Sequence, residues 1–140
     1  MTVINSDNLV LGRMSSMVAE RLLKGEDITL VNVEKAVITG KKENILARYK
    51  KRYDISIKGN PHKGPKISRM PDRIVSWAIK GMLPIKRIRG REAYKKLKVV
   101  ISIPEEFRGA EFDKLRGAQK REGENVITIA QLSKGLGAKW

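Results

Sequence analysis

Positive charge is concentrated in the middle of this 140-residue chain, and this limits which segments can form a core. Residues 41–98 carry nineteen Lys and Arg side chains against four carboxylates, a net charge of +15. Residues 1–40 hold four cations and five anions, and residues 99–140 hold seven cations and six anions. Because like charges repel one another when a chain compacts, we expect the two nearly neutral ends to build the core beneath a basic middle.

A surface with this excess of one sign is typical of proteins that bind polyanions, with nucleic acid the first candidate and an anionic membrane the second. The alternative is an ordinary solvated surface, but such surfaces mix both signs along their length. No apolar run approaches the roughly 20 residues of a membrane-spanning helix, and the N-terminus lacks the pattern of a secretory signal. We therefore expect a cytoplasmic protein that binds nucleic acid and no membrane.

Few residues of this chain are suited to catalysis or metal binding. There is no cysteine, which excludes disulfides and thiolate ligands. His62 is the only histidine, so a zinc site would need carboxylate or water ligands around it, and no motif marks a nucleophile for a Ser-His-Asp arrangement. We expect no catalytic residues, no metal and no cofactor, and a contact with RNA for His62.

Short runs of β-branched residues alternate with apolar residues at helical spacing. The runs at Val3-Ile4, 28–33 and 99–103 predict strands. Apolar residues recur from Leu11 to Leu22 at the spacing of a helix, which Gly25 would end. This alternation predicts an α/β fold around a small, mostly parallel sheet. With only seven aromatic residues in the chain, the core should be mainly aliphatic.

The basic middle should begin with a two-faced helix after Thr39-Gly40. Its apolar face consists of Ile45, Leu46, Tyr49 and Tyr53. The opposite face includes Lys41, Arg48, Lys51 and Arg52. One face can therefore be buried while the other meets phosphates, although a merely solvated basic face is the alternative.

Residues 54–70 are rich in Gly and Pro and predict a long loop. Its cationic side chains could lie in an RNA groove and become ordered on contact. Pro71 should start the next helix, which Gly81 and Pro84 should end. One face of this helix consists of Ile74, Trp77, Ala78 and Gly81. A cluster of arginines and lysines follows from Lys86 to Arg91. Residues 105–125 predict a loop with a helical turn or two, and Thr128-Ile-Ala-Gln131 predicts the capped start of a terminal helix.

Two glycines could be taken for parts of a nucleotide site. Gly12 precedes a helix, and Thr39-Gly40-Lys41 faintly resembles a phosphate loop. Neither segment has the full glycine spacing of a P-loop or a dinucleotide fingerprint. Tight turns and the close approach of RNA phosphates explain these glycines better than a cofactor does.

Several of these segments together resemble the universal large-subunit ribosomal protein thirteen family. The matching pieces are Leu11-Gly12-Arg13 through Ser16 and Ala19, Val31 to Lys35 with Thr39-Gly40-Lys41, and above all PDRIVSWAIKGMLP from Pro71 to Pro84. The segments 60–65 and 128–136 are similar to the archaeal and eukaryotic branch, and the short C-terminal end favours the archaeal side. The resemblance extends from Leu11 to about Leu136 and is thinnest over 104–125.

This resemblance implies a structural protein of the large ribosomal subunit that binds large-subunit rRNA, takes part in subunit assembly and has no catalytic activity. It also implies neighbouring ribosomal proteins as partners. Pattern and resemblance together predict one domain over residues 1–140 with a basic middle at about 41–98. They predict a three-layer α/β/α sandwich around a small, mostly parallel four-stranded sheet.

The sequence thus yields a set of candidate side chains and two alternatives. The candidates for RNA binding are Arg13, Lys41, Lys42, Arg48, Lys50, Lys51, Arg52, Lys58, His62, Lys63, Lys66, Arg69, Arg73, Lys80, Lys86, Arg87, Arg89 and Arg91. The candidates for structural roles are Gly12, Gly40, Trp77, Gly81 and Pro84. The alternatives are a nucleotide-dependent enzyme and a DNA-binding or regulatory protein that uses the same basic surface.

Overall fold

The computed structural model describes residues 1–140 and contains a three-stranded parallel sheet. Its strands are β1 (Thr2–Asn5), β2 (Ile28–Val31) and β4 (Leu97–Val99), in the order β1-β2-β4. The helix α1 (Leu11–Leu23) connects β1 to β2. Gly25 follows this helix with a φ of +99°, the left-handed conformation that ends many helices at glycine, as the sequence predicted.

Two further strands pair with each other and form a second, separate sheet. β3 (Val37–Thr39) and β5 (Val126–Thr128) are antiparallel, with Ile38 opposite Ile127. The α/β class is therefore confirmed, but the prediction of a single four-stranded sheet is wrong. No fourth strand pairs with the parallel sheet next to β1; the pairing there is an isolated bridge between Ile4 and Asp113.

The third predicted strand, at 99–103, is also misplaced, because β4 ends at Val99. The chain leaves the sheet shortly afterwards. Ser102 has a φ of +60°, and its backbone N–H donates a hydrogen bond to the buried carboxylate of Glu34 at 3.0 Å. The backbone N–H of Ser102, which in a longer strand would bond to the neighbouring strand, thus bonds to a side chain more than 60 residues away in the sequence.

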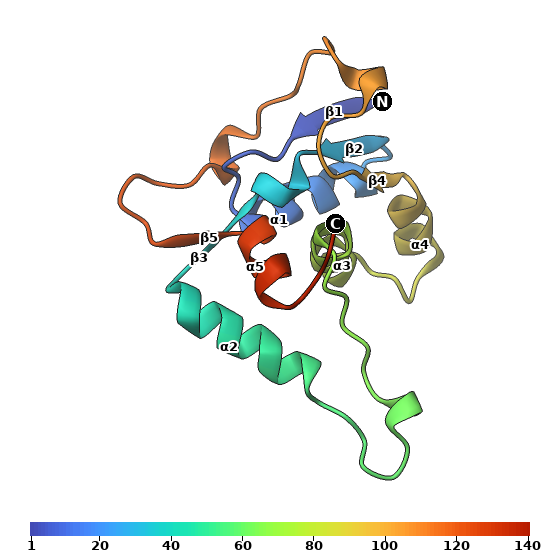
Figure 1. The fold of residues 1–140 in the computed structure, drawn as a ribbon. Coiled ribbons are helices and arrows are strands. Elements are labelled where there is room, and N and C mark those ends of the chain that lie inside the picture. The colour runs from blue at the N-terminus through green and yellow to red at the C-terminus, as the bar shows by residue number, and fades with distance from the viewer.

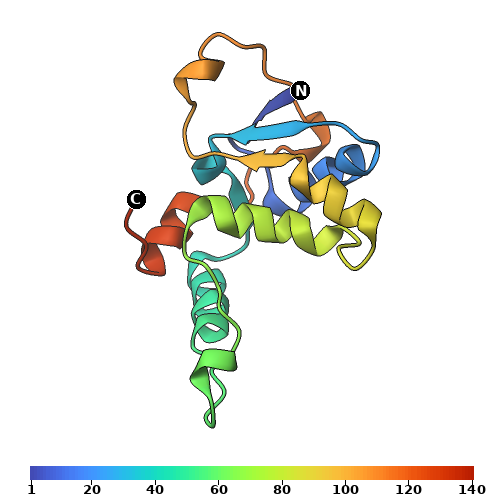
Figure 2. The ribbon, with the colours of Figure 1, turned by 90° about the vertical axis from the view of Figure 1, so that its right-hand side faces the viewer.

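The helices lie on one side of the parallel sheet (Figures 1 and 2). Successive strands move across this sheet in one direction, and right-handed crossovers then place both connections on the same face. In both views α1 and α3 (Pro71–Met82) lie beneath the sheet, whereas the segment 104–113 lies on the other side. That segment contains only a 3-10 turn, Glu105–Phe107. The predicted second layer of helices is therefore not formed.

The core is aliphatic, as the small number of aromatic residues predicted. Six of the 22 residues in the core cluster come from the basic middle, and the two ends supply the rest. Fully buried side chains from α1, β2, α3 and the terminal helix α5 (Ile129–Gly135) meet here. Examples are Met14, Leu30, Ile79 and Leu132. The division into a nearly neutral core and a basic surface therefore follows the division of charge along the chain.

The segment between β4 and β5 is irregular, as predicted, and polar contacts hold it to the body. It forms 3-10 turns at Glu105–Phe107 and Arg116–Ala118. The guanidinium of Arg21 donates a hydrogen bond to the carboxylate of Asp113, and this bond lowers the pKa of Asp113. At the end of the segment, the Thr128 hydroxyl oxygen accepts a hydrogen bond from the backbone N–H of Gln131 at 3.2 Å, which caps α5 as the sequence predicted.

Gly90 lies within the short helix α4 (Ile88–Lys95), where the chain passes very close to itself. A Cβ at this position would lie 2.2 Å from the carbonyl oxygen of Pro84, and backbone atoms cannot move aside as a flexible side chain can. We expect Gly90→Ala to lower the free energy of unfolding by about 1–3 kcal/mol, as measured by urea denaturation.

Gly12→Ala is the matched control for this substitution. Gly12 also lies in a helix, and a Cβ there meets nothing within 4 Å. The exchange should raise the stability by up to about 1 kcal/mol, because alanine restricts the unfolded chain. Equal stabilities for the two variants would show that the close approach at Pro84 is relieved at little cost.

Candidate nucleic-acid interface

The helix α2 (Lys42–Tyr53) and residues 54–70 project from the body of the protein and are called the arm below (Figures 1 and 2). Ile45 is the only buried side chain of α2, while Leu46 and Tyr49 are half-buried. The predicted apolar face is thus present, although 42% of the surface of Tyr53 at its end is exposed. Beyond α2 the arm is a loop with one 3-10 turn, Pro61–Lys63, as predicted.

The cations of the basic middle have no carboxylate partners. The four ion pairs of the structure are Arg13–Glu124, Arg21–Asp113, Lys24–Glu20 and Arg108–Glu105. All of them lie outside residues 41–98, so none of the nineteen cations there has a carboxylate oxygen within 4.0 Å. Their charge is therefore open to an external polyanion.

Most of the predicted RNA-binding side chains are exposed, and they lie on or beside α2, the loop of the arm, α3 and α4. Both views place α2, the loop of the arm and the helices α3 and α4 away from the segment 104–113 (Figures 1 and 2). The exposed candidates are Lys41, Lys42, Arg48, Lys50, Lys51, Arg52, Lys58, His62, Lys63, Lys66, Arg73, Lys80, Lys86, Arg87, Arg89 and Arg91. Lys95, Lys96 and Lys98, which are not among the predicted RNA-binding residues, are exposed as well.

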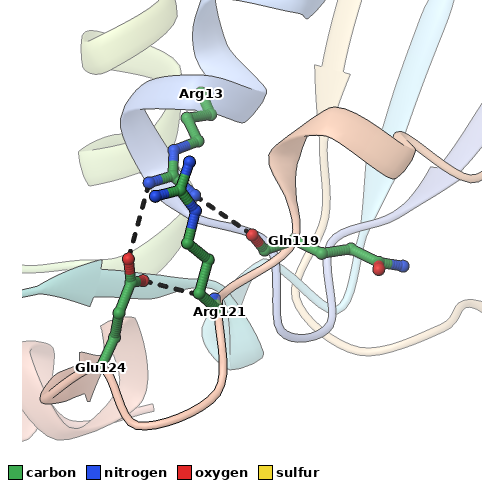
Figure 3. A network of polar contacts seen from close by, with 4 residues as sticks. All are labelled: Arg13, Gln119, Arg121 and Glu124. Atoms are coloured by element: carbon green, nitrogen blue, oxygen red, sulfur yellow. Dashed lines mark hydrogen bonds and ion pairs between the residues drawn. The ribbon is translucent and has the colours of Figure 1, made fainter.

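Arg13 is half-buried, and its guanidinium contacts a segment that is distant in the sequence. Its guanidinium lies 3.7 Å from the carboxylate of Glu124 and donates a hydrogen bond to the carbonyl oxygen of Gln119 at 3.3 Å (Figure 3). The same carboxylate accepts a hydrogen bond from the backbone N–H of Arg121 (Figure 3). These contacts hold the segment before β5 against α1, so the structure gives Arg13 a role inside the protein.

Arg69 is the second exception, and it lies at the base of the arm. Its guanidinium lies 4.0 Å from the centre of the Tyr53 ring, so the end of α2 is held against the residues that precede α3. Its carbonyl oxygen accepts a hydrogen bond from the Ser133 hydroxyl at 2.6 Å, and that hydroxyl accepts one from the indole N–H of Trp140 at 2.9 Å. Arg69 thus joins both sides of the arm to the C-terminal segment.

We expect Tyr53→Ala to loosen the base of the arm without removing a charge. Loss of the contact with Arg69 should lower the free energy of unfolding by about 0.5–2 kcal/mol, measured by urea denaturation. Lys63→Ala is the control, because this exposed side chain makes no hydrogen bond or ion pair and should leave stability unchanged. An unchanged stability in Tyr53→Ala would show that the arm is held by other contacts.

The residues predicted to have structural roles differ in their backbone conformation and in how closely other atoms surround them. Gly40 has a φ of +132° just before α2, a conformation that side chains rarely adopt. Gly12 and Gly81 have open space around them, so packing within the protein does not require a glycine at either position. Pro84 is exposed, but its carbonyl oxygen is the atom that excludes a side chain at Gly90. A glycine inside a helical pattern is the signal that could have identified Gly90.

Trp77 was expected in the apolar face of its helix, but 51% of its surface is exposed. It lines two hollows on either side of α3. Apolar spacing predicted a packing role for Trp77, because spacing alone does not show whether another element covers a helix face. The sequence signal that could have indicated a binding role for Trp77 is the presence of Arg73 and Lys80, each about one helical turn away from it.

The structure contains no cluster of groups suited to a metal ion. No three His, Asp or Glu side chains gather closely enough to hold one. The backbone N–H of His62 donates a hydrogen bond to the Asn60 side chain in a turn of the arm. None of the helices combines the length and the apolar character that crossing a bilayer requires.

The amino-acid sequence matches the sequence model of the family described as Ribosomal protein L13 over residues 1–106. The chain belongs to the ribosomal protein L13 family. Members of the L13 family are structural proteins of the ribosome without enzymatic activity, so the expectation that the chain is not an enzyme is confirmed.

Individual members of the L13 family are similar to the chain over nearly its whole length. The large ribosomal subunit protein uL13 of Archaeoglobus fulgidus is 45% identical over 139 residues, which cover 97% of this chain and 87% of the relative. The protein of that name from Methanosphaera stadtmanae is 44% identical over 140 residues and 99% of both chains. That from Methanococcus maripaludis is 45% identical over 141 residues and all of both chains. These L13 relatives are archaeal, as the sequence predicted.

Proposed function

We propose that the chain is a structural constituent of the large ribosomal subunit that binds large-subunit rRNA and supports assembly of the subunit. The observation that carries this proposal is the basic middle, whose nineteen cations lack carboxylate partners. Bound phosphates would neutralise these charges and release the counterions that surround the RNA, which favours binding. The names of the archaeal relatives point to the same particle.

The two parts of the fold would divide this work. The body supplies a rigid aliphatic core that carries α3 and α4, while the arm extends outward between RNA helices. The double-helical parts of rRNA present phosphates and 2′-hydroxyls more readily than base edges, and flexible lysines and arginines suit such contacts. Neighbouring ribosomal proteins would complete the surroundings of the chain in the cytoplasmic subunit, and the whole chain would act as one domain.

Fractionation of a cell lysate on a sucrose gradient tests the proposal. The protein should sediment with the large subunit and remain there through a moderate salt wash. A triple variant of α2, Lys50→Gln, Lys51→Gln and Arg52→Gln, should be washed off at lower salt, because three phosphate contacts are removed.

A second triple variant provides the matched control. Lys114→Gln, Arg116→Gln and Lys120→Gln removes the same charge from exposed positions on the body, outside the basic middle. It should stay with the subunit as the unmodified protein does. Protein at the top of the gradient, or equal loss of the two variants, would contradict the proposal.

A further inference from the structure

Trp77 is an exposed aromatic side chain in the middle of α3, a helix whose opposite face is buried. The buried residues of α3 are Pro71, Ile74, Val75 and Ile79, and Trp77 is not part of the core cluster. Water covers about half of its surface, although indole rings are largely buried in most proteins. Packing within this chain therefore does not explain the position of the ring.

The first hollow beside Trp77 lies between α2 and α3 and has a volume of about 320 Å³. Tyr49 from α2 and Ile67 from the returning part of the arm form its apolar lining with the indole. Arg52 and Arg73 also line it, and both are exposed. The hollow thus combines two aromatic rings with two unpaired guanidinium groups.

The second hollow lies on the other side of Trp77, between α3 and the chain that leads to α4, with a volume of about 690 Å³. Lys80, Lys86 and Arg87 line it. Gly81 does so too, and no contact in the protein requires a glycine there, since a Cβ would meet nothing within 4 Å. Glycine disfavours a helix relative to alanine, so its presence here is consistent with a ligand that approaches the helix backbone.

The charges around the indole indicate what kind of ligand fits. Five cations line the two hollows, and neither hollow is lined by a carboxylate. An apolar peptide side chain would cover the ring but leave these cations without counter-charge. A nucleotide offers a flat base for the ring and phosphates for the cations, the combination that proteins use to bind unpaired RNA.

We propose that an unpaired nucleotide of the rRNA binds across Trp77. Its base stacks on the indole, one flanking phosphate lies at Arg52 and Arg73, and the phosphate on the other side lies at Lys80, Lys86 and Arg87. This inference rests on the proposed binding of rRNA. It adds contact with a base to the proposed phosphate contacts, because one aromatic ring is free to stack.

The test compares substitutions of Trp77 in binding to a large-subunit rRNA transcript. Trp77→Leu keeps an apolar side chain but cannot stack, and it should weaken binding about tenfold or more. Trp77→Phe should restore most of the affinity, because its ring can stack. Neither variant removes a charge, so the dependence of the affinity on salt should match that of the unmodified protein, whereas Arg73→Gln should make it less steep. Circular dichroism confirms that each variant is folded.

Fluorescence provides an independent readout of stacking. In a Trp140→Phe background, Trp77 is the only tryptophan, and the rRNA transcript should quench its emission. Polyphosphate, which carries charge but no bases, should bind without this quenching. Strong, salt-dependent RNA binding that is unchanged in Trp77→Leu, or equal quenching by polyphosphate, would overturn the stacking proposal alone. Failure of the unmodified protein to bind the transcript would instead overturn the proposed function.

Discussion

Raising the monovalent salt concentration from about 50 to about 200 mM will weaken binding of the chain to a naked large-subunit rRNA fragment by three to four orders of magnitude. The basis is the number of unpaired cations on α2, the loop of the arm, α3 and α4. If roughly eight of them contact phosphates at once, the logarithm of the affinity should fall with the logarithm of the salt concentration with a slope of about −5 to −7.

Filter binding over a series of salt concentrations measures this slope. The triple variant of α2 at positions 50–52 should make the slope less steep by about 2 to 3, since each lost phosphate contact contributes about 0.9. The triple variant of the body at positions 114, 116 and 120 should leave it unchanged. A slope near zero would contradict the phosphate mechanism, and equal competition by duplex DNA would favour a DNA-binding protein.

Removal of residues 126–140 will abolish the cooperative unfolding transition. This segment contains β5 and α5, and it contributes Ile127, Ile129 and Leu132, each with 0% of its surface exposed. Truncating one such side chain to alanine costs about 2–5 kcal/mol. The loss of all three therefore approaches the total stability of a typical domain, about 5–15 kcal/mol, and β3 loses its partner strand as well.

Thermal unfolding followed by circular dichroism tests this expectation. The matched control replaces residues 57–64, at the tip of the arm, with two glycines. Nearly all of these residues are exposed, so the midpoint of unfolding should hardly change even though RNA binding weakens. A cooperative transition in the C-terminally shortened chain would show that the body is complete without β5 and α5.

Features that depend on nearby residues were predictable from the sequence. Apolar spacing identified α1, α2, α3 and α5, and the Thr128 cap lies three residues from its partner. The pairing of β3 with β5 could not be predicted in this way, because Ile38 and Ile127 are far apart in sequence and each strand has only three residues. The prediction of a strand at 99–103 was wrong for a similar reason. The chain turns at Ser102, whose backbone N–H donates a hydrogen bond to Glu34, a residue far away in the sequence.

The candidate interface, too, could be predicted only where it depends on residues that are close together in the sequence. The excess of like charge in residues 41–98 predicted sixteen side chains that the structure shows to be exposed. Arg13 and Arg69 are exceptions and are half-buried, because their guanidinium groups contact Glu124 and the Tyr53 ring, which come near them only in the fold. Trp77 was assigned to packing because its spacing matches that of buried residues, and only the structure shows that no element covers it.

The pairing of β3 with β5 has a consequence for the time course of protein synthesis. A ribosome makes β3 first and then translates the whole basic segment before β5 emerges. During that interval the nascent polypeptide already exposes its lysines and arginines, while the aliphatic core still lacks the buried side chains of β5 and α5. Contact with a polyanion can therefore precede completion of the core by β5 and α5.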